Sequence, residues 1–254
     1  MNFEQLYKIL EHNYSKYNNL DFIDSDPIQI PHRFVKKEDI EISAFLVSTI
    51  AWGRRDLIIR SGKRMMQFLD NSPYDFVMNA TGKEIEQLQT FVHRTFNGLD
   101  FIQFVLNLRN IYTYHRGLEA VFNKGFQKEN KVKEAIVNFR KFFFEHNTYT
   151  HSFKHIADVS KKASAKRLNL FLMWMVRKDD VGVHFGIWQK IPKSALMLPL
   201  DIHTANMGRY LGLLQRKQND WLAVEQITEN LRKFDHTDPT KYDFALFGMD
   251  LEKN

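Results

Sequence analysis

The sequence predicts an all-α protein, and three observations support this prediction. Apolar residues recur at spacings of three and four along most of the chain, which is the period of an amphipathic helix. The alternation of apolar and polar residues that is typical of strands is nearly absent. Hydrophobic residues make up 44% of the 254 residues, so the chain can bury one large core or two modest ones.

The expected helices follow one another with recognisable starts and ends. Asp100 and Asp201 are the expected N-caps of two helices, and Gly212 ends the second of them. The longer helices are expected over residues 3–14, 38–52, 56–69, 100–114, 131–144, 163–176, 201–211 and 220–234. Residues 177–199 form a loop that is long for a compact domain, and such a loop is usually functional or contains a short helix.

Composition excludes several classes of protein. The chain has no Cys, which excludes a disulfide scaffold, a Cys nucleophile, a thiolate zinc site and a Cys-ligated iron–sulfur cluster. The apolar run Leu168–Val176 is far shorter than a membrane span, and the N-terminus lacks the pattern of a signal peptide. We therefore expect a cytoplasmic protein without a membrane partner. The formal net charge of +6 permits a polyanionic partner.

The positive charge is concentrated in one segment without acids, Ser160–Lys178. Its cations are Lys161, Lys162, Lys166, Arg167, Arg177 and Lys178. Lys166 and Arg167 stand where an apolar helix begins, and both apolar surroundings and neighbouring cations disfavour the charge of an ammonium group. A neutral amine is what Schiff-base chemistry requires. The alternative is a solvated basic helix start whose lysine stem packs on neighbouring apolar side chains.

A second candidate element is the segment Met197–Leu213, which contains Asp201. The N-cap position alone explains an Asp there. Backbone N–H groups at a helix N-terminus also keep such a carboxylate ionised. Asp201 could therefore stabilise a positive charge that develops in a cleft.

Together these two segments resemble the helix-hairpin-helix DNA glycosylases, in particular the 8-oxoguanine branch. In that superfamily a catalytic Lys ends a hairpin and is followed by a buried helix, a Pro-x-Asp-x-His segment and a helix that ends in Leu-Gly-Leu. The matching residues here are Lys166, the run RLNLFLMWM, Pro199, Asp201, His203, Arg209, Leu211, Gly212 and Leu213. The C-terminal DPTKYDFALFGMDLEK is similar to the last helix of 8-oxoguanine glycosylases. Over most of its length the chain also resembles a family of bacterial conserved hypothetical proteins, which carries no activity with it.

The resemblance implies a fold of two helical subdomains with a cleft between them. The first would be a helical-barrel-like subdomain over 36–199, with the hairpin-like segment 156–176. The second would combine 1–35 and 200–254. The implied protein is a cytoplasmic, nucleoid-associated monomer that binds double-stranded DNA with a flipped damaged base and needs no cofactor or metal.

The resemblance also implies roles for individual residues. Lys166 would be the Schiff-base nucleophile and Asp201 the catalytic carboxylate of a DNA glycosylase and abasic-site lyase. The substrate-binding residues would be Phe247, Asp243, Trp52 and His203, and those that contact DNA would be Lys161, Lys162, Ser164, Arg167, Arg54 and Arg55. Core packing of the aromatic residues and a solvated face for the arginines are the alternatives.

The chain departs from the family pattern at two places. Lys162, Ala163 and Ser164 replace the Gly-x-Gly hairpin, and Ala and Ser tolerate a positive φ poorly, so we expect a reshaped hairpin. The segment Trp52–Arg54 replaces the Gln-containing wedge. A DNA-binding protein on the same scaffold without base excision is therefore the alternative function, and a protein-interaction module is a third.

A metal site is a further alternative. His151, His155 and Asp158 are spaced for one face of a helix, and this spacing can bind a metal ion. Three polar residues on a solvated face explain the same spacing, and we expect no metal.

Overall fold

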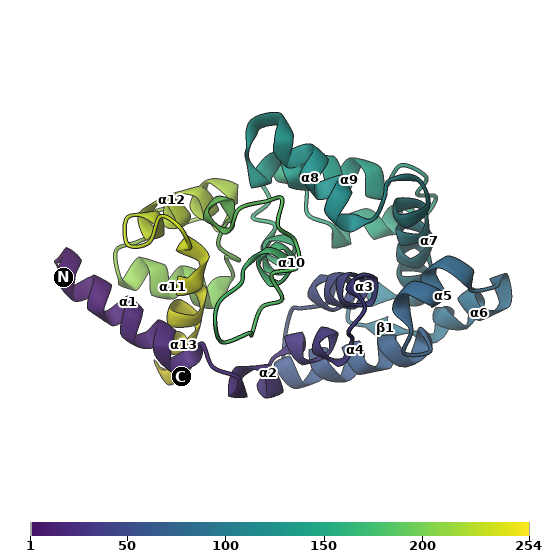
Figure 1. Cartoon of the computed structure of the whole chain (residues 1–254), viewed down its shortest axis with the longest axis horizontal. Coiled ribbons are helices and arrows are strands. Elements are labelled where there is room, and N and C mark those ends of the chain that lie inside the picture. Colours follow the sequence, from purple (N-terminus) through teal and green to yellow (C-terminus); the bar gives the residue numbers. More distant parts are fainter. Residues whose placement is uncertain (1, 254) are drawn as a thin grey trace. The chain divides into compact units, whose positions relative to one another are not determined.

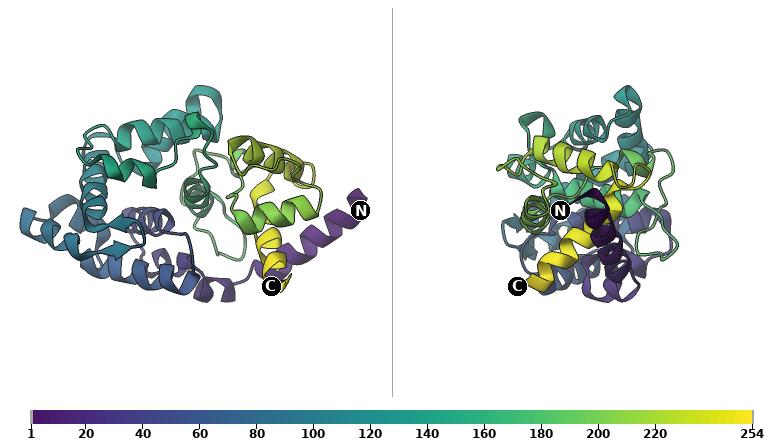
Figure 2. Two further views of the ribbon diagram at one scale, coloured as in Figure 1. Left: turned by 180° about the vertical axis from the view of Figure 1, so that it is seen from behind. Right: turned by 90° about the vertical axis from the view of Figure 1, so that its left-hand side faces the viewer.

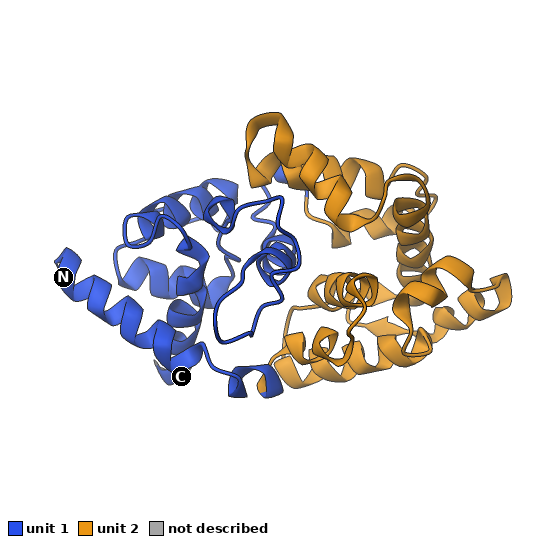
Figure 3. Ribbon diagram, in the orientation of Figure 1, with its two compact units in different colours: residues 1–24, 158–254 blue, residues 25–157 orange. Residues whose placement is uncertain are grey.

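The computed structural model describes residues 2–253 and is mostly helical, which confirms the all-α prediction. The chain forms two compact units (Figure 3). Unit 1 combines Met1–Asp24 with Asp158–Asn254, and unit 2 is Ser25–Ala157. No helix in the described residues is long and apolar enough to cross a membrane.

Unit 2 is a helical assembly with one short antiparallel strand pair (Figure 1). Its α-helices are α3 (Lys37–Thr49), α4 (Arg55–Phe68), α5 (Pro73–Asn79), α6 (Gly82–Gln87), α7 (Gly98–Tyr114), α8 (Leu118–Glu129) and α9 (Val132–Phe143). The 3-10 helices are η1 (Pro27–Gln29), η2 (Pro31–Arg33), η3 (Leu88–Thr90) and η4 (Thr150–His155), and the strands are β1 (Val92–His93) and β2 (Phe96–Asn97).

Aromatic side chains fill the core of unit 2. Phe45 of α3 contacts Phe104 of α7 and also Phe139 and Phe143 of α9, with ring centroids 5.3–5.8 Å apart. Such ring pairs add to the stabilisation that comes from burying their apolar area. Helix α8 packs beside α9 (Figure 1). The helix expected over 38–52 corresponds to α3. It lies in the core of unit 2, because it is buried from Ile40 to its end.

The beginning of α7 corrects one expected N-cap. The cap is Asn97, whose side chain accepts a hydrogen bond from the Asp100 N–H at 3.0 Å. Asp100 lies three residues further on, and its Oδ2 accepts from the Asn97 N–H, also at 3.0 Å. This reciprocal pair is a capping box, so the acid expected to be the cap is the second partner instead.

Unit 1 contains both ends of the chain. Its helices are α1 (Phe3–Tyr17), α2 (Asp21–Ser25, at the boundary with unit 2), η5 (Val159–Lys161), α10 (Lys166–Val176), η6 (Lys193–Ala195), α11 (Ile202–Tyr210), α12 (Trp221–Arg232), η7 (Pro239–Tyr242) and α13 (Asp243–Lys253). Helices α1 and α13 lie side by side, and α13 also packs on α11 (Figures 1 and 2). The short helix η6 confirms the expectation for the long loop, and Gly212 follows α11 with a φ of +74°.

A buried arginine holds together three distant parts of unit 1. The Arg177 side chain follows the C-terminus of α10 and has no exposed surface. Its Nε donates to Asp238 Oδ2 at 3.0 Å, its Nη1 to Asp179 Oδ2 at 2.6 Å and its Nη2 to Tyr14 Oη at 2.9 Å. Burial acts to lower the pKa of Arg177, but the nearby Asp238 and Asp179 outweigh it and raise that pKa.

The compact units divide the chain at other points than the expected subdomains. Residues 158–199 were expected with the helical-barrel-like part, but they belong to unit 1, and residues 25–35, expected with the second part, belong to unit 2. Their hydrogen bonds give the reason, because the Trp221 N–H donates to Lys162 O at 2.9 Å and Arg177 bonds to both Asp238 and Tyr14.

Candidate functional site

Lys166 and Asp201 lie next to each other in unit 1, although they are far apart in the sequence. Lys166 is the first residue of α10, and Asp201 is the N-cap of α11, as expected. The Oδ1 of Asp201 accepts from the Thr204 N–H at 3.0 Å, while its Oδ2 lies 3.9 Å from Lys166 Nζ. The two side chains are 26% and 27% exposed, so the pair lies at the surface of unit 1 and is accessible to solvent.

The segment before Lys166 is a tight turn rather than a glycine hairpin. Positive φ angles occur at Lys162 (+65°) and Ala165 (+52°), which is the strained region that Gly usually occupies. Ala163 forms an isolated bridge with Asp220, which ties the turn to the start of α12. Asn169 of α10 donates its side-chain N–H to Ser164 O at 3.2 Å and so braces the turn from the other side.

The expected DNA-contacting residues of unit 1 gather at this end of α10. Lys161 and Lys162 are exposed, and Ser164 and Arg167 are partly buried. Burial lowers the pKa of Arg167 to about 10. The N-cap residue of α10, Ala165, makes no side-chain capping hydrogen bond, and first-turn N–H groups of a helix favour anions.

His203 links α11 to α13 beside this pair. Its Nδ1 lies 2.6 Å from Asp250 Oδ2, and its ring meets that of Phe247 edge-on at 6.2 Å. Asp243, Phe247 and Asp250 share one face of α13 because they are four and three residues apart. Two of the four expected substrate-binding residues, Asp243 and Phe247, therefore lie on the helix that also contacts His203.

Three expected site residues belong to unit 2. Trp52 is partly exposed, and its ring lies 5.3 Å from that of His93 and 6.2 Å from that of His155. Arg54 is exposed and forms an ion pair with Asp56 at 2.8 Å. Arg55 begins α4 and is partly buried.

The structure does not place His151, His155 and Asp158 on one helix face, which corrects that expectation. The two histidines lie on the 3-10 helix η4, which ends at His155, whereas Asp158 caps η5. Asp100 takes the place of Asp158, because its carboxylate lies 2.9 Å from His151 Nδ1 and 3.0 Å from His155 Nε2. The spacing in the sequence indicated both histidines, but it could not indicate Asp100, which comes from another part of the chain.

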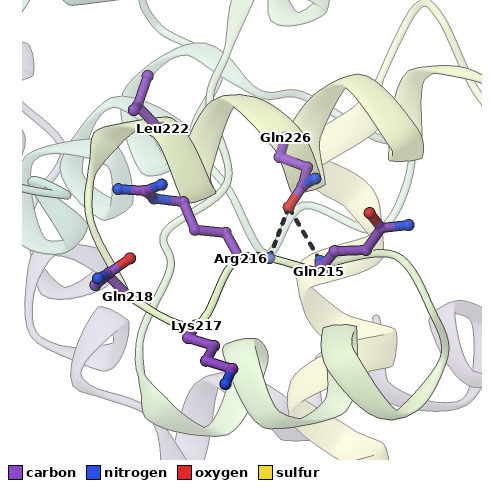
Figure 4. A pocket seen from close by; sticks show the side chains of 6 residues that line it. All are labelled: Gln215, Arg216, Lys217, Gln218, Leu222 and Gln226. Carbon is purple, nitrogen blue, oxygen red and sulfur yellow. Dashed lines mark hydrogen bonds between the residues drawn. The ribbon is translucent and has the colours of Figure 1, made fainter.

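A polar pocket lies on the loop between α11 and α12 of unit 1 (Figure 4). The Oε1 of Gln226 accepts from the backbone N–H groups of Gln215 and Arg216 at 3.0 Å each. Arg209, one of the residues that match the glycosylase pattern, donates to Arg216 O and Lys217 O. These bonds shape the loop, and no motif of the sequence indicated them.

One comparison with known proteins gives a match. The model of the family described as Protein of unknown function (DUF2400) matches residues 26–252. The chain belongs to this family. No curated protein and no solved structure matches the chain.

Proposed function

We propose that this protein is a DNA repair glycosylase with abasic-site lyase activity, which excises an oxidised purine through a Schiff base on Lys166. The single observation that supports the proposal is the distance of 3.9 Å between Lys166 Nζ and Asp201 Oδ2. A nucleophilic amine beside a carboxylate, both open to solvent, has the chemistry that this reaction needs.

In the proposed reaction Lys166 Nζ, after it has lost a proton, attacks C1′ of the flipped deoxyribose. The bond between C1′ and the base nitrogen breaks, and the base leaves with the electron pair and takes up a proton. The Asp201 carboxylate stabilises the positive charge that develops on the sugar. Loss of an amine proton and opening of the sugar ring give the Schiff base. Removal of a C2′ proton then expels the 3′ phosphate and nicks the strand.

The N-terminal end of α10 is suited to DNA phosphates. The first-turn N–H groups offer partial positive charge there, and the exposed Lys161 and Lys162 add two full charges. Lysine side chains would then replace the bare backbone of a glycine hairpin in contacting phosphate. Such contacts carry affinity and little sequence information, and they weaken with salt.

The face of α13 supports a role in holding the base. Phe247 is partly exposed and can stack on a flipped base, and Asp243 is one turn away with hydrogen-bonding oxygens. His203 is a positioning residue, since its bond to Asp250 ties the helix of Asp201 to that of Phe247.

The test is covalent trapping by borohydride on duplexes that carry 8-oxoguanine, uracil or an abasic site. We expect an adduct with at least one duplex, and we expect Lys166→Gln to abolish it. Lys193→Gln is the matched control, because Lys193 also lies near a carboxylate, 3.5 Å from Asp238, in the same unit. Trapping that survives in Lys166→Gln would exclude Lys166 as the nucleophile.

A DNA-binding protein without base excision is the second candidate. This candidate is favoured by the side chains of Lys162, Ala163 and Ser164. They occupy the place where the glycine hairpin of the helix-hairpin-helix glycosylases brings its backbone close to phosphate. In this case no duplex is trapped, while binding persists and falls steeply with salt. Absence of binding at low salt would reject both candidates.

A further inference from the structure

Three side chains of types that can ligate a metal ion converge in unit 2. Asp100 lies in the first turn of α7, and His151 and His155 lie on η4. One ligand atom from each of the three residues lies within 4.8 Å of the other two. His151 Nδ1 is 2.9 Å and His155 Nε2 is 3.0 Å from the carboxylate of Asp100.

The cluster is buried on one side and open on the other. Asp100 has no exposed surface and the His155 side chain is 2% exposed, whereas the His151 side chain is 35% exposed. A carboxylate without contact to water is costly unless opposite charge or hydrogen bonds compensate it. The partly exposed His151 leaves a route by which an ion can enter.

The surroundings hold each ligand in place. The Asn97 N–H donates to Asp100 Oδ2 and fixes the carboxylate. The ring of His155 lies against those of Phe96, at 4.9 Å, and Trp52, at 6.2 Å. Partners that orient the ligands and an apolar shell around them are features of metal sites in proteins.

We propose that Asp100, His151 and His155 bind a divalent transition-metal ion of the zinc type. Imidazole and carboxylate together suit Zn²⁺, and three protein ligands leave the fourth tetrahedral position for water. His151 Nδ1 lies 2.9 Å and 3.0 Å from the two oxygens of Asp100, so these ligand atoms are already close together.

Metal binding requires one local change. The exposed Lys154 has its Nζ 2.6 Å from His151 Nε2, which acts as the acceptor. When Nδ1 binds the ion, Nε2 carries the ring proton, and the Lys154 side chain turns toward solvent. The ion would link η4 to the start of α7 within unit 2 and would stabilise only the folded unit. This proposal does not depend on the proposed DNA chemistry.

The test is zinc binding by the full chain after treatment with a chelator. We expect stoichiometric binding by calorimetry and metal analysis, together with a rise in Tm. His151→Gln should weaken binding at least about 100-fold, since loss of an outer partner alone costs about 10–100-fold. His115→Gln is the matched control, because His115 lies 2.9 Å from the carboxylate of Glu145 in the same unit. The zinc affinity of this variant should equal that of the wild type.

A second measurement holds even if His151→Gln does not fold. Co²⁺ bound by the wild-type chain in tetrahedral geometry gives intense visible absorption, and zinc should displace that signal. Absence of zinc binding, absence of that absorption, or equal affinity of the folded His151→Gln variant and the wild type would overturn the proposal. The cluster would then be a hydrogen-bonded network only.

Discussion

The two ends of α10 carry two cation–carboxylate groups that differ in nearly every property. At the N-terminal end Lys166 Nζ and Asp201 Oδ2 are 3.9 Å apart, and about a quarter of each side chain is exposed. At the C-terminal end Arg177 has no exposed surface and donates to both Asp179 and Asp238 at hydrogen-bond distance. The same helix thus begins at an open pair and ends at a closed one.

The difference separates a stabilising role at one end from the proposed reactive role at the other. Donors that are fully occupied and buried resist change, and loss of either partner leaves an uncompensated charge inside the protein. A loose pair near water contributes little to stability and leaves its amine accessible. We therefore expect substitutions at the C-terminal end to change the free energy of unfolding, and substitutions at the N-terminal end to change the proposed reaction.

The largest effect is expected for Arg177→Met. This change leaves Asp238 buried without its main partner, and it should lower the free energy of unfolding by about 3–5 kcal/mol. Denaturant unfolding measures it. Arg216→Met is the control, since Arg216 and Asp220 are both partly exposed, and its loss should stay below about 1 kcal/mol. Equal losses in the two variants would show that burial does not distinguish the pairs.

The next effect concerns Asp201→Asn at the open end. Asn also caps helices well, so Tm should change little. Removal of the negative charge should slow adduct formation by about 10²–10³-fold, the usual cost of losing one electrostatic stabiliser. Asp220→Asn is the control, since Asp220 caps α12 in the same way. A loss of stability in Asp201→Asn without a loss of rate would make the Asp201 role structural.

A smaller effect follows from the acid titration of Asp179. Burial acts to raise its pKa, but the Gly182 N–H and Arg177 outweigh this and lower the pKa from 3.8 to about 2. Because the folded-state pKa is lowered, the stabilisation is complete above about pH 5 and is lost as pH falls toward 2. It amounts to about 2 kcal/mol.

The measurement is the free energy of unfolding against pH for the wild type and Asp179→Asn. The wild type should lose about 2 kcal/mol more than the variant between about pH 5 and 2. Parallel curves would contradict the lowered pKa of Asp179. Other carboxylates titrate in both proteins, so only the difference between the two curves counts.

The smallest effect is expected for Asn169→Ala. The variant loses the hydrogen bond to Ser164 O, which should cost about 1 kcal/mol in the free energy of unfolding. Because this bond braces the turn before Lys166, DNA affinity should fall while its salt dependence stays the same. Asn230→Ala is a suitable control, as it loses a similar bond, to Leu213 O, elsewhere in unit 1. An equal loss of affinity in both variants would argue against a specific role of the turn.

Features that depend on near neighbours could be predicted from the sequence. The amphipathic helices, the Asp201 cap and the end of α11 at Gly212 follow from residues within a few positions of one another. The predicted N-cap of α7 was wrong by three residues. Asn97 and Asp100 are both good capping residues, and only the geometry of the turn separates their roles. Resemblance and motif spacing pointed to Lys166 and Asp201, but not to the distance between them.

The sequence by itself determined the helical class, the basic segment and the residue types available for chemistry. Only the tertiary structure decided that Asp100 meets His151 and His155, that Arg177 reaches both Tyr14 and Asp238, and that residues 158–199 belong to unit 1. The physical reason is the range of the interactions. Periodicity and capping act within one or two helical turns, whereas these contacts join segments whose meeting depends on how the whole unit packs.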